Sequence, residues 1–180
     1  MNEKKDIRSF AFYCLLFFVL AFLGWLWEVG LYFFTEHTFV NRGVYKGPYL
    51  PIYGAGGVLI YFMFHRMKKH PFWVFFGSIL LCCTLEYATG WFLEEKWGIR
   101  WWDYSDHFLN LNGRICLLST IAFGICGTGL VCLIFPFYEK MYAKIPYKLR
   151  NSLMILFLLI FLADAASAAD FPNVGKGISY

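Results

Sequence analysis

Charged residues are scarce in this chain. Only 16% of its 180 residues are Asp, Glu, Lys or Arg, whereas 59% are hydrophobic and 22% are aromatic. An average soluble domain has roughly 25% charged residues, so this composition excludes a soluble domain and indicates a membrane protein. The net charge is only +4 and no basic stripe runs along the sequence, so we expect no nucleic-acid partner.

Several chemical motifs are also missing. The sequence contains no GxxxxGK[ST] phosphate loop, so this chain is not expected to hydrolyse ATP itself. It has no CxxC pair and no HExxH motif, and its six cysteines all fall within apolar stretches, where a free cysteine behaves as a small buried hydrophobe. We therefore expect neither a metal site nor another cofactor.

Long apolar runs, in contrast, are abundant. A helix needs about 20 mostly apolar residues to cross a bilayer core that is about 30 Å thick. The runs lack the two-residue alternation of a membrane barrel, so helices are predicted. We predict an all-α, polytopic bundle that forms a single transmembrane domain over residues 1–180. Its five helices are expected at about residues 10–34, 48–67, 72–93, 115–137 and 152–170.

The distribution of basic residues predicts how the bundle is oriented. Ten of the sixteen Lys and Arg residues lie in the amino-terminal segment or in the breaks after the second and fourth runs. Because Lys and Arg concentrate on the cytoplasmic side, we predict a multi-pass protein of the cell membrane with a cytoplasmic amino terminus and an extracytoplasmic carboxyl terminus. The polar loops 35–47 and 94–114 then share the extracytoplasmic face.

Four carboxylates fall inside the predicted helices, one of them, Asp170, at the very end of the last helix. Glu28 lies about two turns from the outer end of the first helix, and Glu86 lies roughly 22 Å from the inner surface by helical rise. Asp164 lies among alanines in the last helix. Because an ionised carboxylate in hydrocarbon costs at least about 2.5 to 3.5 kcal/mol, such groups are expected to face the bundle interior beside a partner. Arg42, Arg100 and Arg114 are the candidate partners, since guanidinium pairs well with carboxylate.

The stretch WWDYSDHFLNLNGR, residues 101–114, gathers polar and aromatic side chains between two apolar runs. Tryptophans anchor at membrane interfaces, and the Asp, Asn and Arg residues can bind polar groups. We expect this stretch to form the wall of an outward-facing polar cavity; the alternative is that the charged residues only fix the register of the helices. The candidate substrate-binding residues are Glu28, Asn41, Arg42, Tyr53, Glu86, Glu94, Trp102, Asp103, Asn112, Arg114 and Asp164.

Five segments together resemble a known family. The runs GWLWE (24–28), NRGVYKGPYLPIYGAGG (41–57), LEYATGWFLEE (85–95), RWWDYSDHFLNLNGRICL (100–117) and PNVGKGI (172–178) are similar to the bacterial ABC-transporter type IV, or CmpB-like permease, family. The resemblance implies a permease subunit in the membrane. Because the chain has no phosphate loop, any ATPase would be a separate subunit, docking on the basic segment YEKMYAKIPYKLR.

Three functions remain open at this stage. The first is a permease-like protein that binds or transports a small solute or ion through the polar cavity. The second is a membrane enzyme acting on lipid headgroups or lipid-linked substrates, with Glu28 and Glu86 as acid and base and with Arg42 and Arg114 as phosphate anchors. The third is a structural or assembly subunit. The expected partners are the lipid bilayer and either a separate ATPase subunit or further copies of the chain.

Overall fold

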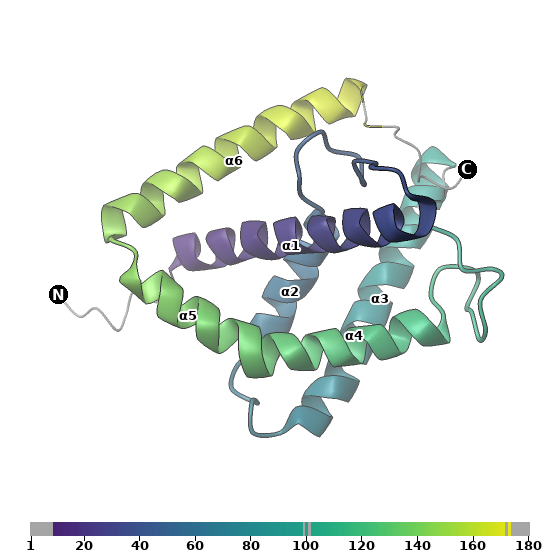
Figure 1. The fold of residues 1–180 in the computed structure, drawn as a ribbon, viewed down its shortest axis with the longest axis horizontal. Helices are drawn as coiled ribbons and strands as arrows, with labels where there is room; N and C mark the ends of the chain where they lie inside the picture. The colour runs from purple at the N-terminus through teal and green to yellow at the C-terminus, as the bar shows by residue number, and fades with distance from the viewer. Residues whose placement is uncertain (1–8, 99, 101, 172, 174–180) are drawn as a thin grey trace. The chain divides into compact units, whose positions relative to one another are not determined.

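The structure, a computed structural model, describes residues 9–98, 100, 102–171 and 173, except for the side chain of Trp97. The described residues contain helices and no strand, which confirms the all-α prediction. The helices, labelled in Figure 1, are α1 (Phe10–Glu36), α2 (Pro51–Phe64), α3 (Pro71–Trp97), α4 (Leu117–Gly129), the π-helix η2 (Leu130–Ile134), α5 (Phe135–Lys144) and α6 (Tyr147–Asp170).

The helices correspond to the five predicted segments, with changes at their ends. Leu117–Lys144, which comprises α4, η2 and α5, is a continuous apolar helix. Among the described residues, four helices are long and apolar enough to cross a membrane. The second helix has only 14 residues instead of the predicted 48–67. It begins at Pro51, because proline has no amide hydrogen and is best tolerated in the first turn of a helix. The third continues past residue 93 to Trp97, where Gly98 ends it with a φ of 67°.

Large apolar side chains remain exposed along the long helices. Examples are Phe22 on α1, Leu80 on α3, Leu118 on α4 and Leu162 on α6, whose exposed fractions range from 45% to 73%. In water such surfaces would be unfavourable, whereas hydrocarbon accepts them. The protein is therefore a multi-pass integral membrane protein.

The chain divides into two compact units, which are described separately. Within the described residues, unit 1 contains residues 9–58, 137–171 and 173, and unit 2 contains residues 59–136. In unit 1, α1 packs on α6 and on the first half of α2. A side chain at Gly54 would overlap Phe17, and one at Gly57 would overlap Leu20. Small residues thus let α1 and α2 approach closely, as is common between membrane helices.

In unit 2, α3 packs along α4 through a similar use of glycine. A side chain at Gly124 would overlap the ring of Phe75, and one at Gly127 would overlap Ser78. Each helix presents two residues three positions apart, so they lie on the same helical face. Ser78 is fully buried at this contact. The glycines of α4 thus let the Phe75 ring and the Ser78 side chain of α3 pack directly against the α4 backbone.

The π-helix Leu130–Ile134 interrupts the α-helical pattern just before Pro136. Proline has no amide hydrogen to donate to the carbonyl one α-helical turn earlier. The amide of Phe135 donates to the carbonyl of Leu130, five residues before it. This wider turn keeps the helix continuous through a position that would otherwise break it.

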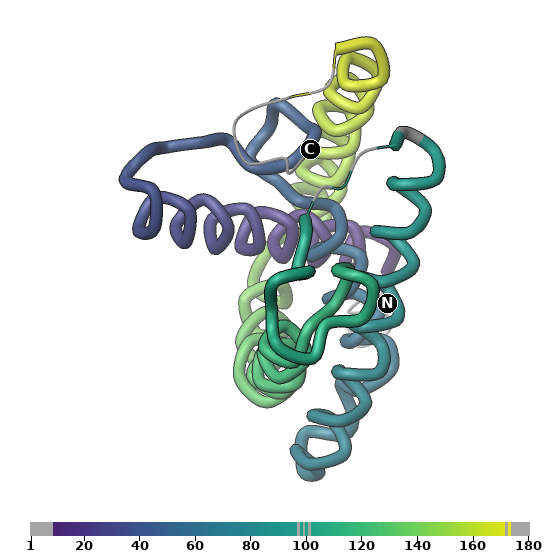
Figure 2. Tube along the Cα trace, turned by 90° about the vertical axis from the view of Figure 1, so that its right-hand side faces the viewer, coloured from purple at the N-terminus to yellow at the C-terminus, as the bar shows by residue number. Residues whose placement is uncertain are grey.

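Two long loops carry most of the candidate site residues. One joins α1 to α2 in unit 1, and the other joins α3 to α4 in unit 2. Figure 2 shows the second loop doubling back on itself before α4 begins. An isolated bridge between Leu111 and Ile115 closes this bend, in which the amide of Tyr104 also donates to the carbonyl of Gly113 at 2.7 Å.

Candidate functional site

The candidate residues fall into two groups, one in each unit. The unit 1 group contains Glu28, Asn41, Arg42, Tyr53 and Asp164. The unit 2 group contains Glu86, Glu94, Trp102, Asp103, Asn112 and Arg114. Within each group, charged and polar side chains from segments far apart in the chain contact one another. The prediction of a single cavity shared by both groups stays a prediction.

Glu28 of α1 lies beside a guanidinium and a phenol. The Arg42 side chain approaches the Glu28 carboxylate at 3.7 Å, and both side chains are about a quarter exposed, at 22% and 28%. The Tyr53 hydroxyl donates a hydrogen bond to the same carboxylate. Arg42 also lies over the ring of Tyr32, 5.4 Å from its centre. The charge of Glu28 is therefore balanced by a cation that stays partly accessible.

Asn41 fixes the shape of the loop between α1 and α2. Its side-chain oxygen accepts a hydrogen bond from the indole of Trp25 at 2.6 Å, and its amide nitrogen donates to the carbonyl of Lys46 at 2.9 Å. The side chain of Asn173 donates to the carbonyls of Asn41 and Gly43, at 2.9 Å each. These bonds occupy Asn41, so its role in the structure is to hold the loop together.

Asp164 anchors the same loop from α6. Its carboxylate accepts hydrogen bonds from the backbone amides of Lys46 at 3.1 Å and Gly47 at 2.8 Å, and from the hydroxyl of Tyr49. The Lys46 ammonium donates to Ser167 one turn farther along α6, at 2.8 Å. A carboxylate with three donors is energetically satisfied, which explains how an acid is kept near the end of an apolar helix.

The carboxylate of Asp164 also affects two phenols in the loop. The pKa of Tyr49 is raised well above its ordinary value, first by burial and then by its hydrogen bond to Asp164. Burial raises the pKa of Tyr45 as well, with the negative charge of Asp164 as the second cause. Both phenols therefore stay protonated through the neutral range, and Tyr49 remains a hydrogen-bond donor.

In unit 2, the carboxylate of Glu94 holds two arginines at once. It pairs with the Nε of Arg100 at 2.9 Å and with a terminal nitrogen of Arg114 at 2.7 Å. Glu94 lies in the last turn of α3, one turn before the αL residue Gly98, whereas the two arginines belong to the loop. The ion pairs thereby tie both ends of the loop to the end of α3.

Arg114 is the least exposed charged side chain of these ion pairs, with 14% of its side chain accessible. Its guanidinium lies 5.3 Å from the centre of the Tyr87 ring, and its carbonyl accepts from the indole of Trp102 at 2.9 Å. Gly90 leaves space for this packing, because a side chain there would touch Trp102 and Arg114. Among the described residues, the buried Nε of Arg114 has no hydrogen-bond partner.

Asp103 and Asn112 shape the loop itself. Asp103 accepts hydrogen bonds from the Ser105 amide at 2.9 Å and from the Ser105 hydroxyl at 2.5 Å. These bonds lower the pKa of Asp103 below its ordinary value. Asn112 adopts a φ of 53°, which asparagine tolerates better than most residues, and its amide donates to the Tyr87 hydroxyl at 2.8 Å.

Glu86 lies on the face of α3 that carries Gly90 and Glu94. The hydroxyl of Tyr104 donates to the Glu86 carboxylate at 3.3 Å. The loop thus reaches back along α3 by more than one turn and supplies a polar neighbour for an acid in the middle of a span.

Sequence reasoning missed several residues that organise these groups. Tyr49, Tyr87, Tyr104 and Ser105 donate to or accept from the candidate residues, and Asn173 holds the loop of unit 1. Three of them are tyrosines in aromatic-rich stretches, where no local pattern separates a hydrogen-bond donor from an interface anchor. The Asp-Tyr-Ser sequence at 103–105 was the available signal, since an aspartate often caps a serine two residues later.

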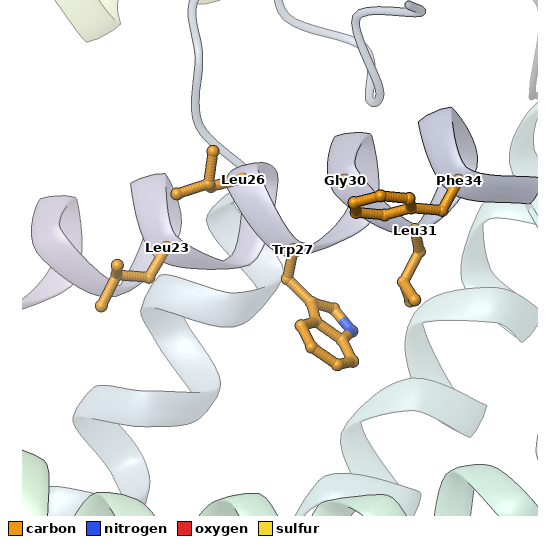
Figure 3. Close-up of a pocket in the computed structure, with 6 residues that line it drawn as sticks. All are labelled: Leu23, Leu26, Trp27, Gly30, Leu31 and Phe34. Atoms are coloured by element: carbon orange, nitrogen blue, oxygen red, sulfur yellow. The ribbon is translucent and has the colours of Figure 1, made fainter. Parts of the chain in front are cut away.

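A hollow in unit 1 is apolar and lies on one face of α1. It has a volume of about 270 Å³ and is lined by Leu23, Leu26, Trp27, Gly30, Leu31 and Phe34. In Figure 3 the side chains of Trp27 and Leu31 flank the space beside Gly30. This lining suits hydrocarbon and offers no group to a charged solute, so the predicted polar cavity is not this hollow. Within the described part of the chain, no group of three His, Cys, Asp or Glu residues could hold a metal ion.

Comparison with protein families gives a clear result. The model of the family described as Putative ABC-transporter type IV matches residues 15–169. Because the match covers most of the chain, the protein belongs to this family, as the resemblance implied. Comparisons with curated proteins and with solved structures give no match. The matched range includes both loops and every candidate residue described above.

Proposed function

We propose that this membrane protein is a permease-like subunit that binds a small solute or ion through the charged groups at the ends of its helices. One observation carries the proposal. Arg114 is largely buried beside Glu94, and its Nε has no hydrogen-bond partner among the described residues. Burying a charged group is expensive, and an ion pair often stabilises a fold no better than apolar packing does. A donor left over in such a place supports a role in holding a ligand.

The charges of both signs support a polar pathway rather than a single counter-ion. The Glu28 and Arg42 side chains remain about a quarter exposed, and Glu86 lies within a span. Intramembrane ionisable residues commonly mark substrate or ion routes. We further propose the orientation predicted by the basic residues, with the amino terminus in the cytoplasm and loops 35–47 and 94–114 outside. If transport is driven by ATP, the ATPase is a separate subunit.

Proteoliposome uptake tests the proposal. Wild-type protein would be assayed with labelled phosphate, sulfate, acetate, glutamate, potassium and choline, and we expect at least one to accumulate. Glu86→Gln and Arg114→Gln should each abolish that uptake, because one removes a charge in a span and the other removes the buried guanidinium. Arg66→Gln, at an exposed arginine outside these groups, is the matched control. Normal uptake by both inserted, folded variants would contradict the proposal.

An enzyme acting on lipid headgroups is the second candidate. The observation that favours it is the Glu28 and Arg42 pair, which places a carboxylate 3.7 Å from a partly exposed guanidinium. Such a pair combines an acid or base with a phosphate anchor. Accumulation of a lipid precursor in a deletion strain, reversed by wild type but not by Glu28→Gln, would favour this function over transport. An unchanged lipidome in the deletion strain would contradict the enzyme function.

A further inference from the structure

The turn between α5 and α6 is built around one arginine. The Arg150 guanidinium donates to the carbonyls of Ile145 at 2.7 Å and Ala143 at 3.1 Å. It also lies over the ring of Tyr142, 4.3 Å from its centre, and Tyr142 is buried. Carbonyls at the end of a helix lack amide partners within the helix, so Arg150 satisfies those at the end of α5. The turn therefore has a defined shape.

Three lysines on this turn, unlike Arg150, do not bond to the carbonyls at the end of α5. Lys140 and Lys144 are exposed and lie one helical turn apart on α5, and Lys148 is exposed at the start of α6. Within the described part of the chain, none of the three forms an ion pair. Glu139 is the single acid in the sequence between residues 137 and 150. The turn thus presents an excess of positive charge that the described residues do not neutralise.

The position of the turn decides which molecules lie next to this positive charge. It joins the end of one membrane-spanning helix, Leu117–Lys144, to the start of the next, Tyr147–Asp170, through only two residues. Figure 1 shows α5 turning sharply into α6. A connection this short between two spanning helices must lie at the bilayer surface. Met141 and Tyr147, beside the lysines, are 46% and 61% exposed. Apolar side chains next to lysines suit the boundary between acyl chains and phosphates.

We propose that the surface formed by Lys140, Lys144 and Lys148 binds the phosphate groups of anionic phospholipids. Three ammonium groups on a rigid turn complement the negative charge of such headgroups, and Met141 and Tyr147 enter the adjoining acyl region. The proposal rests on the membrane position of the turn and does not depend on the transported solute or on transport itself.

Native mass spectrometry of the full chain tests this binding. Delipidated protein would be mixed with equal amounts of phosphatidylglycerol and phosphatidylcholine, and the ratio of the two bound lipids measured. We expect wild type to favour phosphatidylglycerol. In the triple variant Lys140→Gln/Lys144→Gln/Lys148→Gln, the ratio of bound phosphatidylglycerol to phosphatidylcholine should fall about fivefold for each lysine removed. The preference should also fall at high salt.

The matched control is Arg66→Gln/Lys68→Gln/Lys69→Gln, which removes the same charge from exposed residues of another short connection. It should keep most of the preference. A triple Lys-to-Arg variant at 140, 144 and 148 should keep all of it and shows that the turn tolerates substitution. The proposal is overturned if wild type shows no preference, or if both triple glutamine variants lose it equally. Co-purification of an acidic protein that depends on the three lysines, without lipid preference, would assign the surface to a protein partner instead.

Discussion

The two long loops are anchored by different kinds of interaction. In unit 1, Asp164 holds its loop mainly with neutral donors, namely two backbone amides and the Tyr49 hydroxyl. In unit 2, Glu94 holds its loop with two arginines. Hydrogen bonds to neutral donors change little with salt, whereas partly exposed ion pairs are screened by it. Two polar loops of one membrane protein can therefore respond differently to the same conditions.

The largest effect is expected from Asp164→Ala. This change leaves two amides and a phenol without their acceptor, which we expect to cost about 2–4 kcal/mol of the free energy of unfolding. Thermal unfolding in detergent measures it, and protease cleavage in residues 37–50 should increase. Asp170→Ala, at an exposed acid on the same helix, is the control and should behave as wild type. Equal effects of the two changes would remove the anchor role from Asp164.

A smaller effect is expected from Glu94→Gln, because its side chain is 29% exposed and its ion pairs are partly screened. The loss should appear as faster amide hydrogen exchange in residues 98–116 without a change in residues 37–50. Glu95→Gln, at the exposed neighbour, should not alter exchange. If exchange accelerates in both loops, the two anchors are not independent.

Both loops are held by carboxylates and should weaken in acid, whereas residues 37–50 should also weaken in alkali. Hydrogen bonds from Ser105 hold the pKa of Asp103 below its ordinary 3.8. Its contribution is therefore complete above that value and is lost as the pH falls through the lowered pKa. The pKa of Tyr49 is raised above its ordinary 10.0. Its contribution is complete below 10.0 and is lost as the pH rises through the raised pKa.

Exchange protection, corrected for the intrinsic effect of pH, tests this contrast. Both loops should loosen below about pH 4, and only residues 37–50 should loosen above about pH 10. When phenolate absorbance is followed as the pH is raised, Tyr49→Phe should lack the part of the increase that appears at the highest pH. Loosening of both loops above about pH 10 would show that global unfolding, not Tyr49, sets the alkaline response.

The smallest effect is the response to salt at neutral pH. Raising the salt from 0.05 to about 1 M shortens the screening length to about 3 Å, so the arginine pairs of Glu94 should weaken. Exchange in residues 98–116 should accelerate modestly, with no change in residues 37–50. In Glu94→Gln, exchange in residues 98–116 should no longer depend on salt. If it still does, charges other than Glu94 cause the salt dependence.

The helices could be predicted from the sequence because hydrocarbon imposes a simple requirement on length and composition. The helix ends were less predictable. Trp97 continues α3 because Gly98 supplies the αL cap, and α2 is short because Pro51 begins it and a polar turn follows Phe64. The ends of the helices depend on local backbone conformation, and the mean hydropathy of an apolar stretch carries no information about it.

The need for partners near the intramembrane acids could also be predicted, but not the pairing. Nothing in the spacing tells that Asp164 receives a hydrogen bond from Tyr49, 115 residues away, or that Arg100 and Arg114 share Glu94. Pairing depends on which helices pack together, and small residues such as Gly127 permit many arrangements. The role of the candidate residues in binding stays a prediction.

The wide turn at Leu130–Ile134 has a consequence for the whole length of its helix. An extra residue in one turn rotates all later side chains by roughly a quarter of a revolution about the axis. Before it, Gly124 and Gly127 face α3; after it, Tyr138 and Tyr142 face Phe12 of α1. The wide turn thus changes which side of the helix the later side chains occupy.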